Sequence, residues 1–258
     1  MQQKRILTLT ILLFLYFGGR GGLLFATDSS THPYSDSVLY QAYLHNNIKI
    51  WKDYIEVSDW QHLNLTERLR LLHYEYGYVA TLIDATEGKT NLQAATYLAR
   101  YERHLTCLQD SLSPSQYAAY LSAANAYTFM LDKRKLISAG LQSFQLAKNA
   151  VRLDSNEPMA LILKGNIYFY APRALGGNKQ QALEMYLKAK QQLEKQRLTA
   201  FNWTYTALLL CIAQCYEKTG QLDKAIEETQ RILKNNPEFI YVRDTYLPSL
   251  LRAKSNKK

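Results

Sequence analysis

Two short stretches of the chain carry side chains that perform chemistry in other proteins. His73-Tyr74-Glu75 has the H-x-E spacing of a zinc deaminase, in which the histidine binds the metal and the glutamate transfers a proton, but the sequence lacks the P-C-x-x-C that completes such a site. Glu87-Gly88-Lys89-Thr90 ends like a phosphate-binding loop, but Ile83 stands where that loop needs its first glycine. We interpret the second stretch as a turn between helices.

The thiol and imidazole groups do not form a metal-binding pattern either. Cys211 and Cys215 lie four residues apart, on one face of a predicted helix, but no histidine or cysteine stands at a completing spacing. With Cys107 as the third thiol, the cysteines cannot form a closed set of pairs. We therefore expect buried apolar thiols, no metal and no cofactor. Catalysis needs several titratable side chains that meet at one site, and the sequence shows no such set. We therefore also expect no catalysis.

The composition favours helices. The 258 residues are 47% hydrophobic and include 6 Pro and 11 Gly, roughly half of average usage, which disfavours a turn-rich sandwich or barrel. We therefore predict an all-α protein. Part of the net charge of +9 lies in Lys133-Arg134-Lys135 and in the last residues, where a turn and a solvated tail explain it. We expect no nucleic-acid partner.

Residues 1–26 have the layout of a secretory signal peptide. Lys4 and Arg5 precede an apolar run from Ile6 to Phe17, and Ala26 suits the cleavage position. The apolar run is shorter than the ~20 residues that a helix needs to span a bilayer. The sequence therefore predicts an exported protein, periplasmic or secreted, without a membrane span in the mature chain.

Behind this segment the chain repeats a pattern of paired helices. The clearest unit runs from Thr206 to Pro237, with its pattern positions at Leu209, Ile212, Ala213, Tyr216, Ala225 and Ile232. Two antiparallel helices approach closely where small residues face each other, and Ala213 and Ala225 are the predicted contacts. Gly220 between them supplies the left-handed residue that ends the first helix.

Three further units align on the same positions. They are marked by Leu161, Gly165, Tyr168 and Ala182, by Tyr120, Ala124, Tyr127 and Ala147, and by Tyr74, Gly77 and Ala94. These residues resemble the tetratricopeptide-repeat (TPR) superfamily, with three units matching across residues 115–240. The resemblance implies a TPR-like right-handed solenoid of antiparallel helix pairs, in which each unit contacts only its neighbours.

The repeat pattern divides the chain into four parts. We predict a signal peptide at 1–26, a linker with one N-terminal capping helix at 27–64, TPR-like repeats at 65–240, and a C-terminal helix with a polar tail at 241–258. The expected helix breaks are Ser58-Asp59, Gly88-Lys89, Ser113-Pro114, Gly176-Gly177 and Gly220.

The loop Pro172-Arg173-Ala174-Leu175-Gly176-Gly177 resembles an exported bacterial branch of the superfamily with a P-x-x-L-G-G insertion between paired helices. The resemblance implies an exported helper of a Gram-negative bacterium that docks another protein. The glycines would provide a turn into the next helix. Alternatively, Arg173 beside that helix start could hold an anion, or the loop could contact the partner.

The resemblance also implies where a partner binds. In such repeats the first helix of each pair lines a concave groove, at positions counted from its small residue. The groove positions and their flanking aromatic residues are Tyr74, Tyr78, Asn125, Phe129, Asn166, Phe169, Tyr170 and Gln214. A row of carboxamides could hydrogen-bond the backbone of an extended peptide, and the rings could form apolar pockets. In the alternative, the amides keep an exposed face soluble and the tyrosines pack between repeats.

Together these observations predict a non-catalytic adaptor for another envelope protein or an extended peptide. The alternative is a periplasmic small-ligand carrier or a transporter-associated TPR component. In that case Tyr74, Tyr78, Phe129 and Tyr170 would enclose an apolar pocket. The sequence does not indicate an oligomeric state.

Overall fold

The computed structural model describes residues 34–84 and 91–256. The predicted signal peptide at 1–26 lies outside the described residues, and so do the expected helix break at Gly88-Lys89 and the phosphate-loop-like residues around it.

The described part of the chain is all-α, which confirms the predicted class. Its α-helices are α1 (Asp36–Leu44), α2 (Ile48–Val57), α3 (Leu65–Asp84), α4 (Leu92–Cys107), α5 (Pro114–Leu131), α6 (Leu141–Leu153), α7 (Pro158–Tyr170), α8 (Lys179–Lys195), α9 (Trp203–Lys218), α10 (Leu222–Asn235) and α11 (Leu247–Ser255). Short 3₁₀ and π-helical turns join several of them. Within these ranges, every helix is too short or too polar to cross a membrane.

Local signals set several of the helix ends. The Ser113 hydroxyl accepts a hydrogen bond from the backbone N–H of Gln116, and the Gln116 side-chain oxygen accepts one from the Ser113 N–H, both at 3.2 Å. Gly176 and Gly220 have φ angles of 90° and 81°, a left-handed backbone that glycine adopts without strain. The breaks expected at Ser58, Ser113, Gly176 and Gly220 are confirmed.

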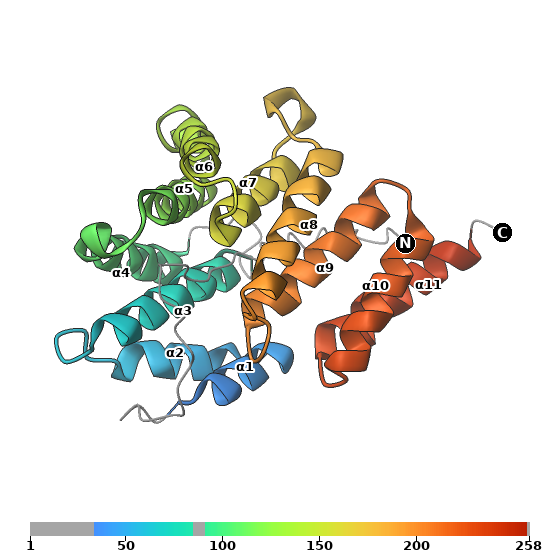
Figure 1. Cartoon of the computed structure of the whole chain (residues 1–258), viewed down its shortest axis with the longest axis horizontal. Helices are drawn as coiled ribbons and strands as arrows, with labels where there is room; N and C mark the ends of the chain where they lie inside the picture. The colour runs from blue at the N-terminus through green and yellow to red at the C-terminus, as the bar shows by residue number, and fades with distance from the viewer. Residues whose placement is uncertain (1–33, 85–90, 257–258) are drawn as a thin grey trace.

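The helices pack as neighbouring pairs, namely α3 with α4, α5 with α6, α7 with α8, and α9 with α10 (Figure 1). The first helices α3, α5 and α7 also contact one another in succession. Gly165 of α7 lies under the ring of Tyr186 of α8, where an added Cβ would be 2.5 Å from the ring atom Cε1. Ala213 and Ala225, the predicted small contacts of the last pair, are both fully buried.

The segment predicted as one capping helix is two helices. α1 ends at Leu44 and α2 begins at Ile48, and Asn46 between them has a φ of 53°. Asparagine tolerates this left-handed conformation better than most residues, so the chain turns where the prediction assumed a continuous helix. The Trp51 indole N–H donates to the backbone oxygen of Leu39 at 2.8 Å, which ties α2 to α1.

The two ends of the helix array meet. α1 contacts α9, and Trp203, the first residue of α9, inserts between α2 and α3. Its ring centroid lies 4.9 Å from that of Trp51, and a Cβ added to Gly77 of α3 would be 2.9 Å from the Trp203 ring. The rings of Tyr43 in α1 and Phe239 after α10 are 5.2 Å apart. The closure cluster consists of Tyr43, Trp51, Tyr74, Trp203 and Phe239.

Buried and partly buried hydrogen bonds join the same two ends. The hydroxyls of Tyr40 and Thr206 are 2.8 Å apart, and Tyr40 also donates to the side-chain oxygen of Asn236, which is 196 positions away in the sequence. His73 Nε2 lies 3.1 Å from Thr204 Oγ1. The N-terminal helices are therefore fixed to the last helix pair by polar contacts as well as by rings.

Replacing Trp203 with alanine is expected to lower the free energy of unfolding by about 3–5 kcal/mol, because it leaves a cavity among several rings. Urea denaturation followed by circular dichroism measures this change. Phe201→Ala is the matched control, since Phe201 is 54% exposed two positions away, and its expected cost is about 1 kcal/mol or less. Equal losses for the two variants would show that the closure cluster has no special role.

Candidate functional site

Most of the predicted groove residues lie inside the molecule. Tyr74, Tyr78, Asn166, Phe169 and Gln214 are buried, with exposed fractions between 3% and 8%. The expectation that these five side chains face a partner is therefore wrong for the chain as it is folded. Its physical reason is that the helices beside them, including α9 with Trp203, cover the positions that an open array would leave in solvent.

Three of the buried groove residues, Asn166, Tyr78 and Tyr74, contact other interior side chains instead. The Tyr186 hydroxyl donates to the side-chain oxygen of Asn166 at 2.6 Å, within the α7–α8 pair. The ring of Tyr78 packs edge-on against that of Tyr97, with centroids 4.7 Å apart. Tyr74 belongs to the closure cluster. The carboxamides consequently do not form a row of available donors and acceptors.

Asn125, Phe129 and Tyr170 remain partly exposed on α5 and α7. Each of these helices is the first of its pair, so they run in the same direction and their C-terminal halves lie at the same rim. The Asn125 side-chain N–H donates to the Leu121 backbone oxygen at 2.9 Å, and Lys133 Nζ lies 4.5 Å from the centroid of the Phe129 ring. We call Asn125, Phe129 and Tyr170 the inner trio.

The four aromatic residues expected to enclose a ligand in a small-ligand carrier do not line a common pocket. Tyr74 and Tyr78 pack against other buried rings, whereas Phe129 and Tyr170 lie near the ends of α5 and α7. The two hollows described next are lined by other residues.

The smaller hollow, about 250 Å³, lies at the loop between α7 and α8. The side-chain oxygen of Asn178 caps α8 by accepting backbone N–H groups of its first turn at 3.0 and 3.1 Å. A Cβ added to Gly177 would lie 1.9 Å from the backbone oxygen of Ala171, so only glycine fits this turn. The geometry favours the turn interpretation of the loop. Anion binding by Arg173 stays a prediction.

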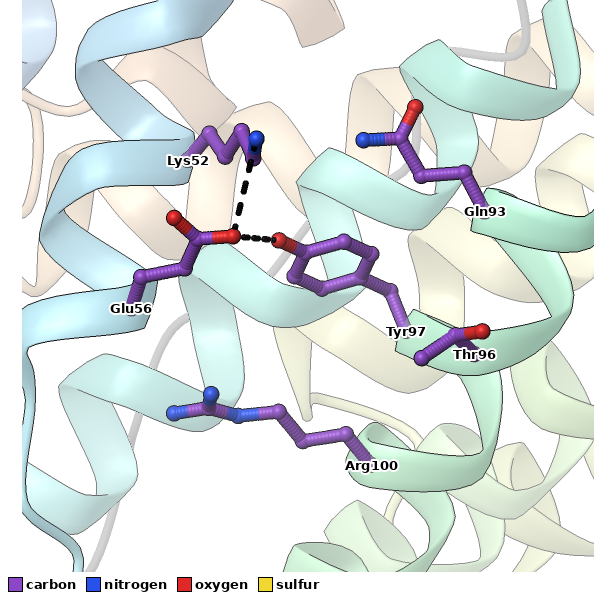
Figure 2. A pocket seen from close by; sticks show the side chains of 6 residues that line it. All are labelled: Lys52, Glu56, Gln93, Thr96, Tyr97 and Arg100. Carbon is purple, nitrogen blue, oxygen red and sulfur yellow. Dashed lines mark hydrogen bonds and ion pairs between the residues drawn. The ribbon is translucent and has the colours of Figure 1, made fainter.

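The larger hollow, about 410 Å³, lies between α2 and α4 (Figure 2). It is lined by Lys52, Glu56, Gln93, Thr96, Tyr97 and Arg100. The Tyr97 hydroxyl donates to Glu56 Oε1 at 2.6 Å, and Lys52 Nζ lies 3.6 Å from the same oxygen. The hydrogen bond from Tyr97 is the main cause that lowers the pKa of Glu56. These polar contacts join α2 to α4.

A buried ionic cluster lies behind this hollow. Glu75 is fully buried, and its two oxygens accept from Arg100 Nε at 2.6 Å and lie 2.8 Å from His104 Nδ1. Arg100 also donates to the backbone oxygen of Ile55 at 2.6 Å, and the ring of Trp60 stacks on His104 with centroids 3.8 Å apart. Because both carboxylate oxygens are occupied, Glu75 positions Arg100 at the edge of the hollow. Sequence reasoning missed this cluster.

The H-x-E stretch is divided between two environments. Glu75 contacts α4, whereas His73 faces Thr204 and the ring of Trp203, whose centroid is 4.7 Å away. Burial, followed by the charge of Arg70, lowers the pKa of His73 to about 3, so the ring is neutral near pH 7. Across the part of the chain that the structure describes, no three His, Cys, Asp or Glu side chains are grouped to hold a metal ion.

The thiols are not all buried. Cys211 and Cys215 are buried as expected, and burial raises the pKa of Cys215 to about 12. The prediction was wrong for Cys107, which is exposed at the last position of α4 because its side chain falls on the outer face of that helix. Burial therefore does not activate the Cys215 thiolate, since activation requires a lowered pKa.

One buried carboxyl has an unusual titration. Glu157 caps α7, is 3% exposed, and accepts a hydrogen bond from the Met159 N–H at 3.2 Å. Burial is the main cause that raises the pKa of Glu157 to about 8. The carboxyl is therefore protonated in the folded chain at neutral pH.

Comparison with family models, curated protein sequences and solved structures finds no match to this chain.

Replacing Glu75 with glutamine is expected to lower the free energy of unfolding by about 2–3 kcal/mol, because the partly buried Arg100 loses the fully buried carboxylate that pairs with it. Glu56→Gln is the control, since Glu56 is a carboxylate about half exposed to solvent whose ion pair is worth about 1 kcal/mol or less. Urea denaturation at neutral pH measures both changes. A Glu75→Gln loss no larger than that of the control would contradict a buried ionic cluster.

Glu157→Gln is expected to change the pH dependence of stability. The raised pKa of Glu157 contributes stability that is fully present below its ordinary value of 4.5 and is lost as the pH rises through about 8. Glutamine keeps the cap but carries no charge, so the variant gains stability relative to the unaltered chain between pH 5 and pH 9. Urea midpoints across this interval test it, and parallel curves for the two proteins would refute it.

Proposed function

We propose that the protein is a non-catalytic adaptor, exported to the envelope of a Gram-negative bacterium, that binds another protein or an extended peptide. In this proposal its helix pairs form a TPR-like right-handed solenoid. The inner trio supports the proposal, because Asn125, Phe129 and Tyr170 present an amide and two rings, all partly exposed, on the contacting helices α5 and α7.

The chemistry of the inner trio suits a peptide in an extended conformation. The Asn125 amide carries both a donor and an acceptor, as a peptide backbone requires. Packed helices lie about 8–10 Å apart, and an extended chain advances roughly 3.3 Å per residue. Rings on α5 and α7 therefore match apolar side chains about three residues apart along the peptide.

The closure cluster restricts the length of the bound segment. Tyr74 on α3 and Gln214 on α9 are buried, so neither end of the predicted groove is accessible. The proposed binding site is thus confined to the rim where α5 and α7 end, and it holds a short segment of the partner.

Photo-crosslinking in the native host tests the proposed function. A photoreactive amino acid at Phe129 or at Tyr170 is expected to give an adduct with the same partner protein, because both positions border one site. The same amino acid at Lys234, exposed on α10, is the control and should not give that adduct. In addition, Asn125→Ala should reduce the yield from Tyr170. Identical adducts from all three positions, or none from Phe129 and Tyr170, would refute the proposal.

A further inference from the structure

The start of α6 exposes large apolar side chains. Ile137, in the π-helical turn Leu136–Gly140, is 79% exposed, and Leu141 is 49% exposed. Phe144 follows one turn later and is partly exposed. The spacing of four and then three residues places the three side chains on one face of the helical segment. Single exposed apolar residues are ordinary, but a contiguous set marks an interaction surface.

The loop between α7 and α8 extends this surface. A Cβ added to Gly176 would lie 3.6 Å from the ring of Phe144, so the loop lies against α6. Leu175, next to that glycine, is 47% exposed. The α5–α6 turn and the α7–α8 loop both lie along the upper edge of the view in Figure 1. The apolar rim consists of Ile137, Leu141, Phe144 and Leu175.

Cations surround the apolar rim. Lys133-Arg134-Lys135 precedes it in the α5–α6 turn, and Arg173 is exposed beside Leu175. Lys148 Nζ lies 5.6 Å from the centroid of the Phe144 ring. Arg134 pairs with Asp132 at 2.8 Å, whereas the other four cations make no ion pair within the described ranges. Asp132 and Glu102 lie close enough to Lys135 for their carboxyl groups to interact with its charge. The rim therefore combines an apolar centre with a border in which cations outnumber the acids beside them.

We propose that the apolar rim docks onto the surface of an anionic lipid membrane. The cations are attracted to anionic headgroups, and the exposed aliphatic side chains enter the boundary between headgroups and acyl chains. A membrane fits better than an acidic protein, because the side chains come from two loops at the same rim and so can meet a flat surface together. This inference does not depend on the proposed function, although the two surfaces adjoin at one rim, where Lys133 lies against the ring of Phe129.

Co-sedimentation of the full chain with lipid vesicles tests the proposal. Phosphatidylcholine vesicles containing phosphatidylglycerol should bind the protein, and vesicles of phosphatidylcholine alone should bind it at least tenfold more weakly. Lys133→Gln and Lys135→Gln should each weaken binding roughly fivefold. Ile137→Asp should weaken it more than either. Raising the salt concentration should weaken binding of the unaltered chain, because headgroup attraction is screened.

Leu92→Asp is the matched control, since Leu92 is 78% exposed at the start of α4, away from the apolar rim. Residues 1–26 are common to all variants and cannot cause a difference between them. Circular dichroism should show unchanged helix content in Ile137→Asp, because that side chain is largely in solvent. Equal losses from Leu92→Asp and Ile137→Asp would overturn the proposal. Equal binding to both vesicle types would also overturn it. A third contrary result is a protein that does not bind vesicles but binds polyglutamate, with this binding lost in Ile137→Asp.

Discussion

The insertion of Trp203 between α2 and α3 is the contact on which the rest of the structure depends. It brings the first residue of α9 against Trp51, so helices at the two ends of the array share one set of rings. In an open array each pair stabilises only its neighbours, and stability is close to a sum over pairs. Here the N-terminal helices contact the last helix pair directly. If either of them unfolds, the other loses packing partners.

This coupling also explains the environments inside the molecule. The indole that fills the space beside Gly77 excludes water from His73 and Tyr74, which is why the histidine loses its ability to take a proton near neutral pH. On the far side of α3, Glu75 is buried and contacts Arg100 and His104 in place of solvent. Adjacent residues of one helix therefore serve two separate interiors, one aromatic and one ionic.

The sequence predicts those features that short-range chemistry decides. The helical class, the helix ends at Ser113 and Gly220, and the small contacts Ala213 and Ala225 follow from residues within one helix pair. The turn at Asn46 was missed because its flanking residues continue the apolar spacing of a helix. The spacing of apolar residues shows which face of a helix is buried. It does not show that an asparagine within that spacing adopts a left-handed backbone conformation and ends the helix.

The candidate site was harder to predict, because burial of its residues depends on distant partners. Asn166 is occupied by Tyr186 of the neighbouring helix, a contact that the repeat spacing could have indicated. Tyr74 is covered by Trp203, and nothing in a repeat pattern states that the last pair returns to the first. Glu75, a carboxylate among tyrosines on a core-facing helix, was the available signal for the ionic cluster.

The closure cluster also has a consequence for synthesis of the chain. Helices α1 to α3 leave the ribosome first, but Trp203 and Phe239, against which they pack, are among the later residues to emerge. Until then the rings of Tyr43 and Trp51 lack part of their native cover, a condition that favours aggregation of nascent chains. The earliest helices to be made are thus among the last to reach their final surroundings.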